Sequence, residues 1–430
     1  MYDIITAGSA TVDVFANTHS QLVKFVTNDG EDDYIAYPSG SKILIKNLTF
    51  LVGGGGTNTA VSFSRLGCKT AYLGNIGLDA NSHRVLDLLK DEQIDFIGTR
   101  SGQTGYSIIL DSIEQDRTIL TFKGANDELS FEEINKDQFD AKWFYSSSLT
   151  GNSQETLRKL VHLAYEKHIK IAFNPSNYQA TLGYEALKDI LERCTVLVMN
   201  KEEANLLFNQ NNQPELFSHF LSEHKSAYVV ITDGAKGAIC HHDDEQCTIT
   251  PSPHLSVVET TGAGDAFASG FVAGLFHHLP LADAMKLGMV QAESVIQSIG
   301  AKESLLLKEV AFSRIGQFQG TISFQKEEQR FTSPKQNHLL PPQFYEAEPE
   351  RGFRFDTGQN ITSLEELGYY LEFMSDEQFN KHVSIHHNHF ADWVEHVFSL
   401  SNLANQLRKL PIRKAQSSLI INFVHKGGNP

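Results

Sequence analysis

The sequence predicts an α/β fold: a doubly wound, mainly parallel sheet with a small β lid, followed by a small C-terminal α-helical domain. Three observations predict it. Short apolar runs alternate with helical patterns up to about residue 301, which is typical of a parallel sheet with helices on both faces. Two ribbon-like segments, 42–51 and 104–124, interrupt this alternation. After residue 362 the pattern is purely helical.

The elements of the sheet follow one another in a regular order. The first strand is expected at residues 4–7, where a short apolar run ends at Gly8. A helix is expected at 57–66, with Ala60 and Val61 on one face and Gly67 as its stop. Later strands are expected at 69–73, 143–146, 170–173, 196–199 and 228–232, and later helices at 82–90, 154–167, 184–192 and 216–224.

The predicted lid comes from the two ribbon-like segments. The second contains strands 107–110 and 118–122 around a polar turn at 114–117. A sheet that projects in this way is suited to cover a site at the carboxyl ends of the parallel strands. An ordinary edge hairpin is the alternative. In the long segment after the first strand, Tyr34, Tyr37 and Lys42 are candidates for selecting a ligand.

The chain is predicted to divide into a domain at 1–304, a linker at 305–361 with one or two strands, and a helical domain at 362–415. Within the linker, residues 317–347 are polar and are interrupted by three prolines. Ser363 and Glu366 form a capping box at the start of the first helix, and two more helices are expected at 376–384 and 388–398. Four histidines cluster there, at His382, His386, His387 and His389. Without an accompanying acidic ligand, we interpret them as surface or packing residues rather than as a metal site.

Composition limits the class of protein. The net charge is −16, from 36 Lys+Arg against 52 Asp+Glu, which disfavours a general nucleic-acid binder. No apolar stretch is long enough for a membrane span, and the N-terminus lacks the pattern of a signal peptide. The four cysteines form no C-x-x-C pair and are interpreted as reduced thiols. We therefore expect a cytoplasmic protein without nucleic-acid or membrane partners.

Residues 260–270, with the sequence TTGAGDAFASG, carry the strongest chemical signal. An extended segment leads into a helix near Ala263, and the first amides of a helix have no internal partners and a partial positive charge. Because Gly262, Ala263 and Gly264 are small, an anion can approach those amides closely. Asp265 beside them can accept a proton from an attacking hydroxyl. A fragment of a dinucleotide fingerprint, with Phe267 at its third glycine position, or a helix capped by Asp265 are the alternatives.

Residues 52–60, with the sequence VGGGGTNTA, carry the second signal. The four glycines allow backbone angles closed to other residues and let the backbone approach a ligand, here through Gly53 and Gly54. Asn58 at the start of the following helix offers a donor and an acceptor to a hydroxyl. The chain lacks the G-x-x-x-x-G-K-[ST] phosphate loop, so it is not a P-loop kinase.

The two motifs in this order resemble the ribokinase-like, or PfkB, carbohydrate kinase family over residues 1–304. Further segments match in sequence order: GSATVD at 8–13, GAN at 124–126, NKEE at 200–203 and TDGAKG at 232–237. The resemblance implies that Asp13 binds substrate hydroxyls and that Asn200 and Glu203 organise magnesium and phosphate, with Glu203 as the metal ligand. It also implies that Thr232, Gly234 and Gly237 line the ATP site.

One position departs from the family pattern. The family commonly has Asp where this chain has Glu259, at a position that often contributes to a monovalent-cation site. The longer carboxylate shifts the ligand oxygen, so a monovalent cation stays undecided. The C-terminal segment resembles a small helical domain of unknown function.

The predicted activity is transfer of the ATP γ-phosphoryl group to a primary hydroxyl of a small sugar or sugar derivative, with Mg²⁺ and with Asp265 as general base. A nucleoside kinase and a non-catalytic sugar- or nucleotide-binding regulatory protein are the alternatives. A homodimer formed through the lid is left open.

Overall fold

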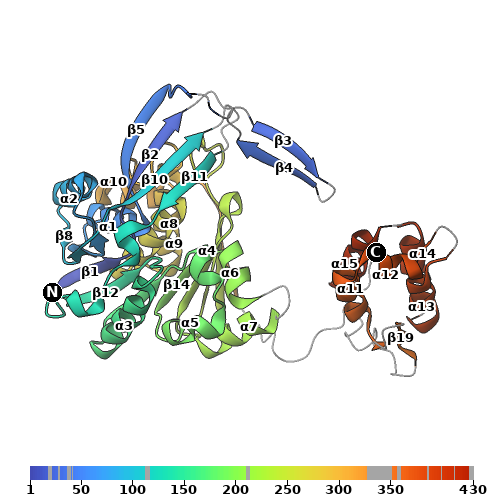
Figure 1. Ribbon diagram of the computed structural model, residues 1–430. Helices are drawn as coiled ribbons and strands as arrows, with labels where there is room; N and C mark the ends of the chain where they lie inside the picture. The colour runs from blue at the N-terminus through green and yellow to red at the C-terminus, as the bar shows by residue number, and fades with distance from the viewer. Residues whose placement is uncertain are drawn as a thin grey trace. The chain divides into compact units, whose positions relative to one another are not determined.

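The computed structural model consists of two compact units, one within residues 1–328 and one within residues 329–430 (Figure 1). The residues that the structure describes are 1–17, 22–27, 30–35, 40, 42–111, 117–209, 214–326, 351–355, 360–384, 387–398, 400–410 and 412–425. Within those ranges, no helix is both long enough and apolar enough to cross a lipid bilayer.

The first unit is built on a ten-stranded sheet of order β18-β17-β16-β15-β14-β13-β12-β1-β6-β8. The pairs from β15 to β8 are parallel, and β16, β17 and β18 extend the other edge in antiparallel pairs. The predicted parallel sheet is confirmed. Its strands are β1 (Tyr2–Ala7), β6 (Thr70–Leu73), β8 (Asp95–Phe96), β12 (Ala141–Ser146), β13 (Lys170–Phe173), β14 (Val196–Asn200), β15 (Tyr228–Thr232), β16 (Ala238–His242), β17 (Glu245–Ile249) and β18 (Ile322–Lys326).

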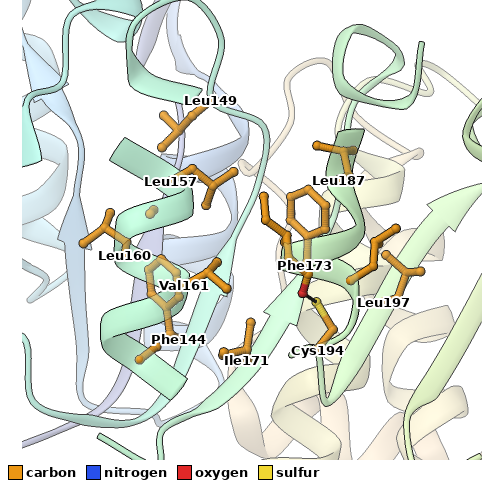
Figure 2. Close-up of a cluster of buried hydrophobic side chains, with 14 of the residues drawn as sticks. Phe144, Leu149, Leu157, Leu160, Val161, Ile171, Phe173, Leu187, Cys194 and Leu197 are labelled. Carbon is orange, nitrogen blue, oxygen red and sulfur yellow. Dashed lines mark hydrogen bonds between the residues drawn. The ribbon is translucent and has the colours of Figure 1, made fainter. Parts of the chain in front are cut away.

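Helices cover both faces of this sheet, as a doubly wound fold requires (Figure 1). On β12 the buried side chains alternate between the faces, because successive residues of a strand point in opposite directions. Phe144 packs into one apolar cluster with α3 and α5, as Figure 2 shows. Trp143 and Tyr145 pack into the other cluster, with α1, α8 and α9. The helices of the unit are α1 (Gly55–Arg65), α2 (Ala80–Asp91), α3 (Ser153–Glu166), α4 (Asn177–Ala180), α5 (Tyr184–Leu191), α6 (Lys201–Phe208), α7 (Pro214–Glu223), α8 (Ala263–Phe276), α9 (Leu281–Val295) and α10 (Lys308–Gly316).

A second, four-stranded sheet of order β11-β10-β2-β5 lies at one end of the unit (Figure 1). The predicted ribbon at 104–124 forms an antiparallel pair, β10 (Gly105–Asp111) with β11 (Arg117–Phe122). The predicted ribbon at 42–51 is only partly a strand: β5 (Asn47–Gly53) pairs with β2 (Thr11–Asn17), and residues 42–45 are irregular. Leu44 is 85% exposed there, so the side chains of this stretch lie largely open to solvent.

Three smaller pairings complete the strands. β3 (Leu22–Thr27) and β4 (Gly30–Ile35) form a hairpin, and β7 (Asn75–Ile76) pairs with β9 (Thr99–Arg100). The third pair belongs to the second unit and is described with it. Lys42 is exposed. Tyr37 lies outside the described residues, as do the side chain of Tyr34 and most of the expected polar turn at 114–117.

The first unit extends beyond the predicted boundary at residue 304. Helix α10 packs against α9 through Ala311, and β18 pairs with β17 at the edge of the large sheet. Residues 305–326, expected to belong to the linker, are therefore part of the first unit. The polar composition of β18 conceals it, because its side chains are mostly exposed at an edge. Residues 327–350 of the predicted linker lie outside the described residues.

The second unit is a helical domain with its own apolar core. Two capping boxes, at Ser363 with Glu366 and at Ser375 with Gln378, start its first two helices. Leu364, Leu367 and Phe390 are fully buried in the core. The described helices outnumber the three expected, and the last one runs past the predicted end at 415. They are α11 (Leu364–Phe373), α12 (Asp376–His382), α13 (His389–Phe398), α14 (Ser401–Arg408) and α15 (Arg413–His425), with the short strand pair β19 (Phe353–Arg354) and β20 (Asn360–Ile361).

Candidate active site

The residue before helix α8 is a glycine at which any side chain would be strained. Gly262 precedes the helix with a φ of 81°, a left-handed conformation that favours glycine. A methyl group on Gly262 would lie 2.5 Å from Cβ of Ala301, so the backbone of the 300–302 loop packs directly on it. The Ala263 N–H donates to the carbonyl of Thr260 at 3.2 Å, and in this described segment no side chain caps the helix. Apart from the Ala263 N–H, the start of α8 therefore keeps its first-turn amides and its partial positive charge for a ligand.

Asp265, in the first turn of α8, contacts the start of α1. Its Oδ2 accepts a 2.8 Å hydrogen bond from Nδ2 of Asn58. A methyl group on Gly55 would lie 3.5 Å from Asp265 Oδ1, so the glycine segment also approaches the carboxylate. Burial raises the pKa of Asp265, and the Asn58 hydrogen bond and the charge of Lys302 oppose that rise. A carboxylate in this setting is a suitable proton acceptor for a hydroxyl.

Two buried polar atoms near Asp265 lack a hydrogen-bond partner within the described part of the chain. They are Oδ1 of Asn58 and the hydroxyl of Tyr145. Tyr145 lies near the end of β12. Burial raises the pKa of its hydroxyl, and the charges of Asp265 and Glu203 add to the rise. Buried polar groups are normally satisfied, so these atoms point to a water molecule or a ligand group at this place.

Asp13 lies on the small sheet and not at the end of β1. It belongs to β2, and its Oδ1 accepts a 2.9 Å hydrogen bond from Thr11. A methyl group on Gly53 would lie 1.8 Å from Asp13 Oδ2, and one on Gly54 would lie 2.4 Å from the carbonyl of Ser9. Burial raises the pKa of Asp13, and hydrogen bonds from Thr11 and Ser107 oppose this. Asp13 and the glycine segment thus pack against each other.

A cavity of about 350 Å³ collects part of the predicted site. Asp265, Gly262, Gly264, Asn200, Glu203 and Thr232 line it, together with Ser147 and Asn174. Asp13, Gly53, Gly54, Asn58, Ala263, Gly234 and Gly237 are not among its lining residues. Gly237 instead lines a second cavity of about 590 Å³, beside Asp233 and Lys236. Asp13 is connected to the first cavity through the glycine segment and Asn58 rather than by exposure to it.

Asn200 and Glu203 form a complete capping box at the start of α6. The Asn200 N–H donates to Glu203 Oε2, and the Glu203 N–H donates to Asn200 Oδ1, both at 2.8 Å. Burial raises the pKa of Glu203 to about 7, and the charge of Asp265 adds to the effect. Both side chains also line the cavity. The capping role and a ligand role are therefore compatible, because Oε1 of Glu203 is left over from the capping box.

The segment 232–237 is a tight turn between β15 and β16. The Asp233 N–H donates to the carbonyl of Gly237 at 2.8 Å, and Lys201 pairs with Asp233 at 3.3 Å. A methyl group on Gly237 would lie 1.9 Å from the carbonyl of Ile249. The turn explains both glycines structurally, and their role in nucleotide binding stays a prediction.

Several residues at this site have no signal in the sequence. Lys302 is 2% exposed, and its Nζ donates to Oγ1 of Thr57 at 3.0 Å. Ser147 and Asn174 line the cavity from the ends of β12 and β13. They stand outside any glycine motif. Only their place directly after buried strands could have indicated them.

The histidine cluster belongs to the aromatic packing of the second unit. The ring of His382 lies 5.4 Å from Phe353 and 5.3 Å from Phe390, measured between ring centroids. His387 stacks on His389 at 4.5 Å. His386 lies outside the described residues. In the parts of the chain that the structure describes, no group of three or more His, Cys, Asp or Glu side chains could hold a metal ion.

Known proteins resemble this chain in sequence. A sugar kinase of Archaeoglobus fulgidus is 28% identical over 250 residues, which cover 57% of this chain and 98% of that protein. A 5-dehydro-2-deoxygluconokinase of Listeria innocua is 24% identical over 326 residues, which cover 71% of this chain and 93% of that protein.

Solved structures resemble it in fold. A nucleoside kinase of Methanocaldococcus jannaschii superimposes with a TM-score of 0.61 at 21% identity, covering 73% of this chain and 98% of that one. A ribokinase of Arabidopsis thaliana, complexed with ribose and ATP, gives a TM-score of 0.60 at 19% identity with the same coverage. These similarities show the ribokinase-like fold.

A family model described as pfkB family carbohydrate kinase matches residues 24–308. The matched range contains the glycine segment, Asn58, Glu203 and the start of α8. With its sugar kinase relatives, this match makes the chain an ATP-dependent sugar kinase. The chain belongs to the pfkB family of carbohydrate kinases.

Proposed function

We propose that this kinase transfers the γ-phosphoryl group of ATP to a primary hydroxyl of a small sugar or sugar derivative, with Asp265 as the general base. The contact between Asn58 and Asp265 at the start of α8 carries the proposal. It joins a partly buried carboxylate beside helix amides, in the wall of a cavity, to the start of α1. Phosphoryl transfer depends mainly on positioning and electrostatics, and this arrangement supplies both.

Each part of the site has a role in that reaction. The oxygen of the acceptor hydroxyl attacks the γ-phosphorus of ATP while Asp265 takes the proton of that hydroxyl. The bond between the γ-phosphorus and the β-phosphate oxygen breaks, and ADP is released. The amides of Gly262 and Gly264 at the start of α8 stabilise the charge on the transferring group, whereas the Ala263 N–H donates to the carbonyl of Thr260. Asp13, Gly53, Gly54 and Asn58 hold the acceptor, and Thr232, Gly234 and Gly237 face the nucleotide.

A magnesium ion fits the donor set of this site. The Glu203 carboxylate would hold it, directly or through water, with Asn200 fixing the carboxylate by the capping box. Magnesium is usually held by one or two carboxylates with phosphates and water, so one protein carboxylate is sufficient. When bound, the ion neutralises phosphate charge. The protein's contribution is the fixed orientation of Glu203.

The acceptor is tested by measuring ADP formation with a panel of compounds. The panel contains ribose, fructose, 5-dehydro-2-deoxygluconate, adenosine and inosine, each with the wild type and Asp265→Asn. We expect a sugar or sugar acid to accelerate ADP formation in the wild type only. Acceleration by a nucleoside would instead identify a nucleoside kinase. ATP binding without acceleration by any acceptor would favour a non-catalytic binding protein.

The small sheet is the proposed surface of a homodimer. Leu48, Phe50, Ile119, Leu120 and Phe122 on β5 and β11 are between 38% and 54% exposed. Exposed apolar side chains on edge strands favour association. Analytical ultracentrifugation should show a dimer that Leu120→Glu dissociates. A wild-type monomer at micromolar concentration would contradict this part of the proposal.

A further inference from the structure

Lys302 is a buried cation that takes no part in the reaction steps proposed above. It lies in the loop after α9 and is 2% exposed. Burying an ammonium group is costly unless partners compensate for the lost water. Its partner is a hydroxyl rather than a carboxylate, since Nζ donates to Thr57 Oγ1 at 3.0 Å. The position of this charge therefore calls for a functional explanation.

Thr57 connects Lys302 to the glycine segment. The Thr57 hydroxyl donates to the carbonyl of Gly53 at 2.7 Å. Gly53 in turn packs on the Asp13 carboxylate, because a methyl group at this glycine would lie only 1.8 Å from Oδ2. A chain of contacts thus leads from the ammonium through Thr57 and Gly53 to Asp13. The ammonium of Lys302 is thereby linked to the glycine segment that is proposed to hold the acceptor.

The same loop contacts the start of α8. Ala301 packs on Gly262, where a methyl group would lie 2.5 Å from the Ala301 Cβ. The Gly300 N–H donates to Glu259 Oε2 at 3.0 Å, just before the GAGD motif. The loop therefore contacts both helix starts that build the site, α1 through Lys302 and Thr57 and α8 through Ala301 and Gly262.

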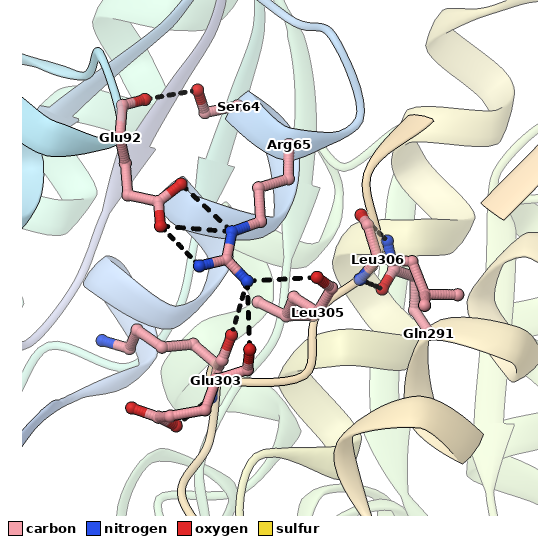
Figure 3. Close-up of polar contacts among 8 residues, drawn as sticks. Ser64, Arg65, Glu92, Gln291, Glu303, Leu305 and Leu306 are labelled. Carbon is pink, nitrogen blue, oxygen red and sulfur yellow. Dashed lines mark hydrogen bonds and ion pairs between the residues drawn. The ribbon is translucent and has the colours of Figure 1, made fainter. Parts of the chain in front are cut away.

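Arg65 and Gln291 bind the backbone of this loop through hydrogen bonds, as Figure 3 shows. Nη1 of Arg65 donates to the carbonyls of Lys302 at 2.9 Å and Leu305 at 3.1 Å. The other guanidinium nitrogens of Arg65 bind Glu92, which orients the group (Figure 3). Gln291 exchanges two hydrogen bonds with the backbone of Leu306. With its backbone fixed in this way, Lys302 has little freedom to move its charge.

The ammonium acts on both carboxylates of the proposed mechanism. Its charge lowers the pKa of Asp13 and that of Asp265, against the effect of burial. Burial lowers the pKa of Lys302 to about 8, and Glu303, Asp13, Asp265 and Glu92 oppose this. The charge of Glu259 also acts on Asp13. Asn58 donates a hydrogen bond to Asp265, and the charges of Asp265 and Glu203 act on each other. At neutral pH Lys302 is therefore protonated.

We propose that Lys302 is a positioning residue for phosphoryl transfer: a fixed internal cation that keeps the acceptor-binding Asp13 and the base Asp265 ionised together. The inference rests on the proposed function of these two residues. Without the cation, the partial burial of the two carboxylates would favour retention of a proton on each of them. A protonated Asp265 cannot accept the proton of the acceptor.

The test compares Lys302→Met with Lys302→Arg, and uses Lys286→Met as a matched control. Lys286 forms a half-buried ion pair with Asp283 on α9, and neither residue lines the cavity. In Lys302→Met we expect kcat to fall about 10- to 100-fold, with little change in the KM for ATP. The acidic limb of kcat against pH should move up by about one pH unit. In Lys302→Arg the acidic limb should return to its wild-type position, because the positive charge is kept. In Lys286→Met both kcat and the acidic limb should match those of the wild type.

A second readout needs no turnover and so separates this inference from the proposed function. If Lys302→Met raises the carboxylate pKa values further in the folded state, the folded protein binds more protons than the unfolded chain. Its stability relative to Lys302→Arg must then fall as pH rises from about 3 to 7. Superimposable stability profiles, or an acidic limb unchanged in Lys302→Met, would overturn the proposal. If Lys302→Met does not fold, Thr57→Val should shift both profiles in the same direction by less, and no shift would equally overturn it.

Discussion

The side-chain amide of Asn58 donates a 2.8 Å hydrogen bond to the carboxylate of Asp265, which lies 207 positions further along the chain. The bond joins the first turn of α1 to the first turn of α8. Both helices begin in glycine segments. Two motifs that are far apart in the sequence of the first unit therefore meet in one site. The chemistry of that site and the packing around it can both be tested by substitution.

Replacing the base should abolish most turnover. In Asp265→Asn the group that accepts the acceptor proton is lost, and loss of a general base typically costs about 10²- to 10⁴-fold. Phosphate binding at the helix amides should remain, so the ATP-induced thermal shift should be retained. Asp283→Asn, which alters a half-buried ion pair on α9 outside the cavity lining, serves as the control and should keep wild-type activity. An active Asp265→Asn variant would exclude Asp265 as the base.

Removing the Asn58 amide should change the pH profile. The hydrogen bond lowers the pKa of Asp265, so Asn58→Ala should raise it. The base is then protonated at higher pH, and the acidic limb of kcat against pH should move upward. Asn75→Ala removes another buried amide, which bonds Ser101, and should leave the limb in place. Equal shifts in the two variants would show that the effect is not specific to Asp265.

Replacing Glu203 should weaken the magnesium dependence of the reaction. The side chain lines the cavity and keeps one carboxylate oxygen outside its capping box. We expect Glu203→Gln to raise the Mg²⁺ concentration for half-maximal activity about tenfold, since Gln preserves the capping contact but not the charge. Glu202→Gln, in the same turn but exposed, is the control. Identical Mg²⁺ titrations of the two variants would argue against Glu203 as the ligand.

The buried ammonium predicts how stability changes at alkaline pH. In the folded protein the pKa of Lys302 is about 8, below its usual value of 10.5. Between these values the unfolded chain binds more protons, so this group's contribution to wild-type stability rises with pH. The stability of the wild type relative to Lys302→Met should therefore increase between about pH 8 and pH 10.5, by up to about 3 kcal/mol. Urea denaturation measures this, and a constant difference across the window would contradict it.

A core substitution in the second unit should leave the first unit intact. Leu367 is fully buried in a cluster formed only by residues of the second unit. Leu367→Ala removes packing worth about 2–5 kcal/mol. Calorimetry should show one transition lowered and the other unchanged, with kinase activity retained at room temperature. Loss of activity together with loss of that transition would instead assign the second unit a role in catalysis.

The sequence by itself determined the parallel sheet and the two glycine motifs. Buried strands of a parallel sheet are continuous apolar runs, and a helix start that exposes its amides needs small residues within one short segment. Both are local properties, so Gly262, Asp265 and Asn58 could be named from the chain alone. The three helices that open the second unit followed from caps and apolar spacing for the same reason.

The tertiary structure alone decided how these parts meet. Asp13 lies on the small sheet because β2 pairs with β5 and β10, which no short window of sequence specifies. Residues 305–326 belong to the first unit because β18 pairs with β17 at the edge of the large sheet. Lys302 reaches Thr57 across 245 positions, and nothing in its own neighbourhood marks it as buried. Pairing and burial of this kind depend on surfaces brought together by the whole fold, so they leave no pattern in adjacent residues.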